Sequence, residues 1–227
     1  MEQTPPGRFM VYAFFQVASS WYGQSKEEKS RAVAEYLARF GELSGTVTLR
    51  PYSTLGLKRN TDFLLWVIAP DLSPIQAFFA GLRKTAMAPY LTEAETFLSV
   101  TRESTYTKQH KEEIAVGVEP GKSQYLFVYP FVKSREWYLL PMETRQKLMN
   151  EHIRIGHEFP RIRINTSYSF GLDDQDFVVS FEGNDPKEFV TLVMRLRESE
   201  GSKYTVRDTP IFTCQRQPID EILWSLG

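Results

Sequence analysis

Two stretches, VYAFFQVASSWY at residues 11–22 and VYPFVKSREWY at residues 128–138, are near copies of each other. Both read Val-Tyr-x-Phe, then a short spacer, then Trp-Tyr. A second pair of stretches, 51–71 and 167–185, shares Tyr-Ser, then Gly-Leu, then Asp-Phe at the start of an apolar run. The matches follow the same order in both halves, about 115 residues apart. This pattern predicts two tandem copies of one unit of roughly 100 residues.

Each copy predicts the same order of elements, β-α-β-β-α-β, which is the ferredoxin-like unit. The first helix begins with the capping box SKEE at 25–28, and the later helices begin with SPIQ at 73–76 and DPKE at 185–188, each with proline at the first helical position. Strands are expected at 9–17, 47–52, 62–68 and 96–100 in the first copy, and at 125–133, 162–168, 177–181 and 204–213 in the second.

In the opening strand of each copy, the odd-numbered and the even-numbered positions are both apolar. This indicates that both faces of the strand are buried. Two ferredoxin-like units whose sheets join would bury both faces, with helices outside and a barrel interior within. The predicted fold class is therefore α+β, a dimeric α+β barrel made of two tandem β-α-β-β-α-β units. The predicted boundaries are an N-terminal unit at 1–107, a polar linker at 108–122 and a C-terminal unit at 123–227.

Composition limits the functional classes. The 227 residues are 42% hydrophobic and 14% aromatic, with a net charge of −1, so a packed core is expected and a nucleic-acid partner is not. The N-terminus has no apolar segment typical of a signal peptide, and no apolar run approaches the ~18 residues of a membrane span. Cys214 is the single cysteine. A cytoplasmic protein without a disulfide framework is expected.

The two copies differ at positions that could carry chemistry. Lys133 has the same strand parity as Tyr129 and Phe131, so it should point to the same side. It could instead be a lysine at a strand end whose ammonium reaches solvent. His152 follows Trp137 by fifteen residues, and Tyr36 follows Trp21 by the same spacing.

His152 lies on the apolar face of its predicted helix, which Leu148 and Ile155 share. It could be a core histidine hydrogen-bonded to the backbone, a general base or a metal ligand. A lone histidine is a poor zinc site. It is the usual situation for haem, where the porphyrin supplies four nitrogens and the protein one axial imidazole.

Four stretches resemble the chlorite dismutase superfamily, and most closely its coproheme decarboxylase-like members: YPFVKSREWYLLP (129–141), RQKLMNEHIRIG (145–156), SYSFGLDDQDFVVSFE (167–182) and LRESEGSKYT (196–205). The resemblance covers essentially the whole chain. It implies haem b or coproheme (iron-coproporphyrin III) in the C-terminal unit and a homo-oligomer, usually a pentamer. It implies His152 as the proximal iron ligand, Glu200 as its hydrogen-bond partner, and a haem pocket that includes Trp137, Met149 and, on the distal side, Ile164 or Asn165.

The resemblance leaves several activities open. In peroxide-dependent decarboxylation of coproheme to haem b, Tyr129 would carry the oxidation and Lys133 would hold a propionate or relay a proton. Decomposition of chlorite to chloride and dioxygen would need a distal cation where Ile164 or Asn165 stands. A haem-binding protein with weak peroxidase activity and a purely structural barrel are the other readings. Because Val-Tyr-x-Phe and Trp-Tyr occur in both copies, Tyr129 and Trp137 could owe their presence partly to ancestry. Lys133 and His152 are then the first candidates for function.

Overall fold

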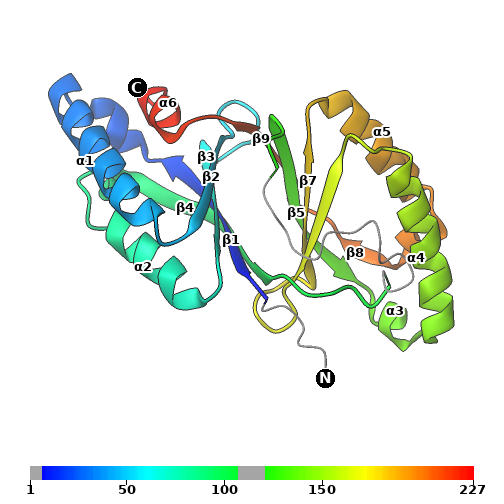
Figure 1. Cartoon of the computed structure of the whole chain (residues 1–227). Helices are drawn as coiled ribbons and strands as arrows, with labels where there is room; N and C mark the ends of the chain where they lie inside the picture. The colour runs from blue at the N-terminus through cyan, green and yellow to red at the C-terminus, as the bar shows by residue number, and fades with distance from the viewer. Residues whose placement is uncertain (1–6, 107–120) are drawn as a thin grey trace. The chain divides into compact units, whose positions relative to one another are not determined.

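The computed structural model describes residues 7–106 and 121–227, so residues 108–120 of the predicted linker lie outside the described residues (Figure 1). The chain forms two compact units. Unit 1 lies within Ser99–Phe212, and unit 2 lies within Pro6–Leu98 and Thr213–Gly227. The C-terminal residues thus pack with the first half of the chain rather than with the second.

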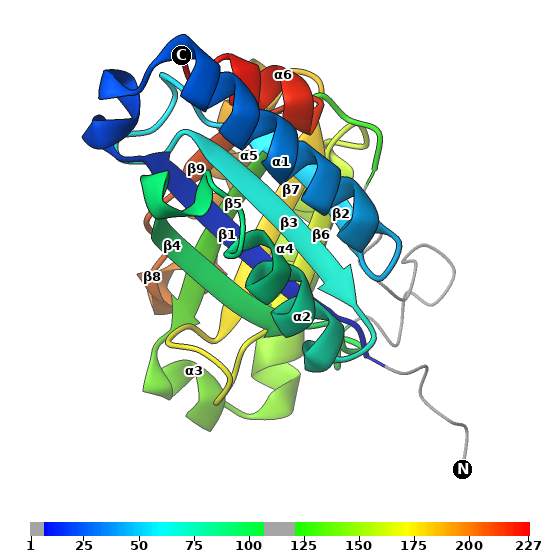
Figure 2. The same ribbon diagram turned by 90° about the vertical axis from the view of Figure 1, so that its left-hand side faces the viewer.

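Unit 2 contains the first copy of the repeat. Figure 2 shows its two long helices lying across one face of its strands. Its strands are β1 (Phe9–Val17), β2 (Thr48–Ser53), β3 (Phe63–Ala69), most of β4 (Leu91–Val100) and most of β9 (Phe212–Arg216), and its helices are η1 (Ser19–Gly23), α1 (Lys26–Ser44), α2 (Leu72–Leu82), η2 (Ala88–Tyr90) and α6 (Ile219–Trp224).

Unit 1 contains the second copy, with its helices on one side of its strands (Figure 1). Its strands are β5 (Tyr125–Lys133), β6 (Arg163–Tyr168), β7 (Phe177–Gly183) and β8 (Thr205–Arg207), and its helices are α3 (Arg135–Leu139), α4 (Met142–His157), α5 (Pro186–Arg197) and η3 (Glu200–Tyr204). The end of β4 joins this unit, where Val100 pairs with Tyr168 of β6.

The predicted fold class is confirmed: each unit is a ferredoxin-like arrangement of antiparallel strands and two principal helices. Three local predictions need correction. The N-cap of α2 is Asp71, whose side chain accepts from Ser73 N, so the cap lies two residues before the predicted Ser73 and the helix begins at Leu72. The closing strand expected at 204–213 is two strands, β8 and β9. The fourth strand is longer than predicted and begins at Leu91.

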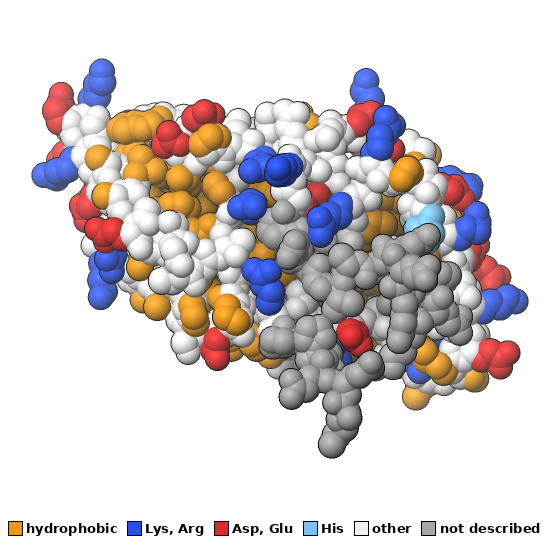
Figure 3. Space-filling model, in the orientation of Figure 1, with side chains coloured by type: hydrophobic (Ala, Val, Ile, Leu, Met, Phe, Trp, Pro, Cys, Tyr) orange, Lys and Arg blue, Asp and Glu red, His pale blue; other side chains and the backbone are white. Residues whose placement is uncertain are grey.

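Strand alternation assigns each side chain of the opening strands to a face. In β1 the odd-numbered Val11, Ala13 and Phe15 join the core under α1 and α2. In β5 the odd-numbered Phe127, Tyr129 and Phe131 join the core under α4 and α5. Charged side chains line the outer sides of α1 and α4 (Figure 3). The helices are therefore amphipathic covers over an apolar sheet face.

The backbone of the two units repeats the same hydrogen bonds. Asp62 Oδ2 accepts from Val17 N at 2.7 Å, and Asp176 Oδ2 accepts from Lys133 N at 2.8 Å. The glycine of each Gly-Leu turn has a φ of 73°, which a residue with a Cβ rarely adopts. The tandem repeat inferred from sequence is thus built into the fold.

These hydrogen bonds correct the register in which the two opening stretches correspond. Val17 matches Lys133, so Ala13, and not Tyr12, matches Tyr129. Tyr12 lies on the opposite strand face, where its ring stacks on Trp66 at 5.1 Å. Aligning the shared Val-Tyr-x-Phe letters therefore shifts one strand by one residue relative to the structural alignment. In a strand, a shift of one residue exchanges the two faces. The counterpart of Tyr129 in the first copy is therefore an alanine and not a tyrosine.

No helix in the parts of the chain that the structure describes is long and apolar enough to cross a membrane.

Candidate cofactor-binding site

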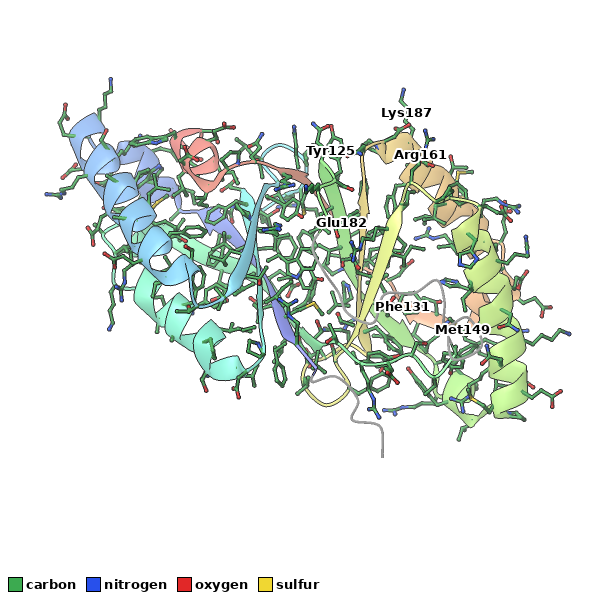
Figure 4. All side chains as sticks on the ribbon, viewed as in Figure 1. Tyr125, Phe131, Met149, Arg161, Glu182 and Lys187 are labelled. Carbon is green, nitrogen blue, oxygen red and sulfur yellow. The ribbon has the colours of Figure 1, made fainter. Side chains whose placement is uncertain are left out.

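The candidate site lies at the C-terminal end of β5, between the strands of unit 1 and α4. Figure 4 shows Phe131 and Met149 at this end, and Tyr125, Arg161 and Lys187 at the other end of the unit. Tyr129 and Phe131 share a strand face and pack in the core under α4 and α5. The pairing of β5 shifts register between Val132 and Lys133, yet the Lys133 ammonium lies 5.3 Å from the centre of the Phe131 ring. The three side chains therefore lie on a common side, as predicted.

Tyr129 is 7% exposed, and its ring stacks on Phe181 with centroids 5.9 Å apart. Burial raises the pKa of its phenol, and the Asp208 carboxylate raises it further, whereas the Arg197 guanidinium lowers it. Arg197 and Asp208 form an ion pair with each other at 2.9 Å. The phenol is therefore protonated at neutral pH and can donate a hydrogen bond or a proton.

Lys133 does not extend into solvent. Its ammonium donates to the carbonyl oxygen of Gly201 at 2.9 Å and lies 4.6 Å from the centre of the Trp137 ring. Burial lowers the pKa of the amine to about 8. At neutral pH the amine still carries its charge, while its proton is held less tightly than in an ordinary lysine.

Trp137 is the buried residue of the short helix α3. Its ring lies 5.6 Å from that of Tyr204 and 6.4 Å from that of Tyr106. In unit 2 the ring of Trp21 lies 5.2 Å from that of Tyr90 in the same relation. Trp137 thus has a packing role common to both copies. A lysine ammonium lies over the tryptophan ring in each unit, Lys133 at 4.6 Å in unit 1 and Lys29 at 5.9 Å in unit 2, but only in unit 1 does that lysine come from the opening strand.

His152 is half-buried on α4, three residues after the half-buried Met149. Burial is the main reason that the pKa of its imidazole falls to about 4, and the Lys133 cation lowers it further. Within residues 7–106 and 121–227 the imidazole makes no hydrogen bond, so the core histidine bonded to the backbone is not what the structure contains. His152 is a neutral imidazole with an available lone pair.

The structure separates the two candidates for the distal side. A Cβ built on Gly156 of α4 would lie 3.2 Å from Ile164 Cδ1, so Ile164 faces the helix that carries His152. Asn165 points to the opposite face of the sheet, where it is 6% exposed and donates to Glu182 Oε1 at 3.0 Å. Of the two, Ile164 shares a side with His152 and Asn165 does not.

The helix-facing side of β6 is only partly covered. Ile164 is 39% exposed, Thr166 is exposed, and Phe177 and Val179 on the neighbouring strand are half-buried. Their counterparts in β3 of unit 2, Phe63 and Leu65, have no exposed surface. We call the side chains of Ile164, Thr166 and Tyr168 the uncovered strip.

A pocket of about 320 Å³ lies at the end of the uncovered strip and is lined by Tyr168, Phe170, Leu172, Val100, Arg102, Glu103 and Thr105. An apolar surface beside the His152 imidazole fits a large flat ligand that contains a metal ion. The imidazole nitrogen would bind that metal ion. Among the described residues no group of three or more His, Cys, Asp or Glu side chains could hold a metal ion. A metal bound by His152 would need its other ligands from a cofactor.

Glu200 is not brought to His152. Its side chain is exposed at the start of η3, and within the described residues it makes no hydrogen bond to the imidazole. Its backbone N–H donates instead to Glu151 Oε2 at 3.2 Å, which places η3 against α4. The hydrogen bond expected from the resemblance is thus absent from this arrangement, although Glu200 lies next to Gly201, the acceptor of the Lys133 ammonium.

Sequence reasoning missed the residues that hold Lys133 in place. Asp176 fixes the backbone of Lys133 and also accepts from the Tyr138 hydroxyl at 2.7 Å. Its signal was visible as the Asp-Phe pair present in both copies. Gly201 contributes a carbonyl oxygen, which no side-chain pattern could reveal.

The sequence profile of the chlorite dismutase family matches residues 26–217 of the chain. A coproheme decarboxylase of Mycolicibacterium smegmatis is 29% identical over 220 residues, covering 96% of this chain and 94% of that protein. A chlorite dismutase of Ideonella dechloratans is 27% identical over 230 residues, covering 98% of this chain and 81% of that protein.

Solved structures of a chlorite dismutase from Candidatus Nitrospira defluvii are similar over nearly the whole chain. A variant with lysine in place of an arginine has a TM-score of 0.90 at 29% identity and covers 98% of this chain and 96% of its own. The complex of the same enzyme with imidazole has a TM-score of 0.88 at 28% identity, with 96% and 94% covered.

Proposed function

The chain belongs to the chlorite dismutase family, and from this premise we propose that it is a haem-dependent oxidoreductase that decarboxylates coproheme to haem b with peroxide. The similarity to a coproheme decarboxylase supports the reaction class. The observation that carries the proposal is the arrangement of Tyr129 and Lys133 on the sheet face that His152 faces, beside an apolar Ile164. We assign His152 as the axial ligand of the cofactor iron.

The residues present fit a porphyrin. A neutral imidazole free of hydrogen bonds to the described residues can donate its lone pair to iron, and the low pKa of His152 keeps that lone pair free above about pH 4. The uncovered strip offers the flat apolar surface that a macrocycle needs. When bound, the iron would supply the redox chemistry that uses peroxide to oxidise propionate side chains.

Tyr129 and Lys133 would perform the protein's part of the reaction. The phenol of Tyr129 is kept protonated by burial, so with a cofactor bound it would hold one proton and could supply one electron beside the porphyrin. The ammonium of Lys133 can orient a propionate by its charge, and its pKa of about 8 lets it pass a proton near neutral pH. The face of the Trp137 ring lies against that ammonium and would help to hold it in position.

Chlorite decomposition is the second candidate, because several similar solved structures are of a chlorite dismutase. A cation beside the iron would be needed to hold an anionic oxidant. The side chain that faces α4 from this part of β6 is the uncharged Ile164, which favours decarboxylation.

The deciding experiment loads the purified protein with iron-coproporphyrin III and titrates it with hydrogen peroxide. We expect the mass of the extracted porphyrin to fall by two molecules of carbon dioxide and four hydrogen atoms, because two propionates become vinyl groups, and we expect Tyr129→Phe to stop the reaction. An unchanged porphyrin mass together with oxygen release from chlorite would reverse the assignment. An unchanged mass without oxygen release would leave a haem-binding protein with at most peroxidase activity.

We propose further that the chain assembles into a homopentamer in the cytoplasm, on the family resemblance alone. Light scattering of the purified protein would give the number of chains, and a mass of one or two chains would contradict the assembly.

A further inference from the structure

Arg145 of α4 is a half-buried cation without an ionic partner in the described parts of the chain. Its Nε is buried and has no hydrogen-bond partner among residues 7–106 and 121–227. Its Nη1 donates to the hydroxyl of Tyr106, at a long 3.4 Å. Arg145 is the first residue of the stretch 145–156 that resembles the chlorite dismutase family. Neither the fold nor the proposed reaction gives Arg145 a role.

The position of Arg145 relates it to the candidate site. It precedes His152 by seven residues, nearly two full helical turns, so the two side chains leave α4 from almost the same face, about 10 Å apart along the axis. Tyr106, which Arg145 touches, lies against the ring of Trp137. The Lys133 ammonium lies over the same Trp137 ring. Two cations therefore gather near one tryptophan beside His152.

A buried guanidinium donor without an acceptor is unfavourable, because it has lost water and gained nothing in return. Guanidinium groups match carboxylates in a planar, two-bonded geometry. We propose, building on the proposed function, that Arg145 binds a carboxylate side chain of the tetrapyrrole. The site is then specific for acid-bearing porphyrins, and Arg145 is a specificity-determining residue.

The test measures binding of metal-free coproporphyrin III, which carries four carboxylates and needs no iron ligand, by fluorescence titration. Arg145→Met keeps the apolar stem and removes the charge, and Arg145→Lys keeps the charge without the two-bonded geometry. Lys29→Met is the matched control, since Lys29 precedes Tyr36 in unit 2 by the same seven residues.

We expect Arg145→Met to weaken porphyrin binding by about ten- to a hundredfold, the range of a hydrogen bond to a charged group. Arg145→Lys should lose less, and Lys29→Met should bind as the wild type does. The melting temperature of the cofactor-free protein should rise in Arg145→Met, because an unpaired charge is removed. A residue with only a structural role would lower it.

Unchanged binding in Arg145→Met would overturn the proposal. So would an equal loss for a porphyrin with cationic substituents. These outcomes are separate from failure of the proposed reaction, because metal-free porphyrin should still bind to His152→Ala. If porphyrin binding depends on Arg145 but peroxide causes no decarboxylation, the proposed reaction is wrong and the proposed role of Arg145 in binding is supported.

Discussion

Unit 2 is filled with apolar side chains at the positions where unit 1 is partly uncovered. Tyr36, which matches His152, is 1% exposed, and Ile222 and Leu223 of α6 complete the core around it with almost no exposed surface. The C-terminal helix α6 packs on α1 and β2, the counterparts of α4 and β6. Unit 1 has His152 and the uncovered strip in the corresponding places.

The difference shows how a duplicated fold can divide its tasks. The aspartate hydrogen bonds and the Gly-Leu turns are the same in the two units, so they do not decide which unit carries a site. The cover that α6 gives unit 2 decides it, together with the exchanges of Ala13 for Tyr129, Val17 for Lys133 and Tyr36 for His152. The predictions below test that division, beginning with the largest expected effect.

Exchanging the histidine for its counterpart should abolish ligation of iron. His152→Tyr removes the neutral imidazole, and we expect the Soret and visible bands of a histidine-ligated iron porphyrin to disappear on reconstitution. Tyr36→His should not create a second set of bands, because α6 covers that position. A histidine-type spectrum retained by His152→Tyr would refute the ligand assignment.

Shortening equivalent phenylalanines should affect the two units unequally. Phe63→Ala in the closed core should reduce the free energy of unfolding by about 3–5 kcal/mol, whereas Phe177→Ala should cost clearly less because Phe177 is already half-exposed. Denaturant unfolding of both variants measures the difference. Equal losses would show that the end of unit 1 next to the site is packed as tightly as unit 2.

Lys133 should give the cofactor-free protein a distinctive pH dependence. Its folded-state pKa of about 8 lies below its ordinary value of 10.5, so between these pH values the unfolded chain binds more protons and folding gains stability as pH rises. Below pH 8 the full cost of burying the charge applies. The stability of the wild type relative to Lys133→Met should therefore improve by on the order of 1–2 kcal/mol from pH 7 to 10. A pH-independent difference between their unfolding curves would contradict the shift.

The smallest effect concerns the helix starts. Ser25 forms a capping box with Glu28, whereas its counterpart before α4 is Pro141, which offers no side-chain cap. Ser25→Ala should cost about 1 kcal/mol of unfolding free energy, and Pro141→Ala should cost less. Thermal unfolding of the two variants would compare them, and a Ser25→Ala loss no larger than that of Pro141→Ala would mean that the capping box adds no stability beyond an uncapped start.

Much of the site was visible in the sequence, and one misreading shows where such reasoning stops. His152 and Lys133 were found because comparison of equivalent positions in the two copies shows where the copies differ. Tyr129 was undervalued because Tyr12 stands at the same place in the matched letters, although it faces the other side of its strand. A slip of one residue leaves the letters aligned and reverses the faces, and only the hydrogen bonds to Asp62 and Asp176 reveal it.

By itself the sequence determined the repeat, the order of elements and the two residues that break the repeat, because alternation, helical spacing and capping are local properties of the chain. The tertiary structure alone decided that Ile164 and not Asn165 faces α4, that Gly201 receives the Lys133 ammonium, and that Arg145 is left without an ionic partner in the described residues. Each of these depends on contacts between segments distant in the chain, where burial sets the charge and the available partners of a side chain.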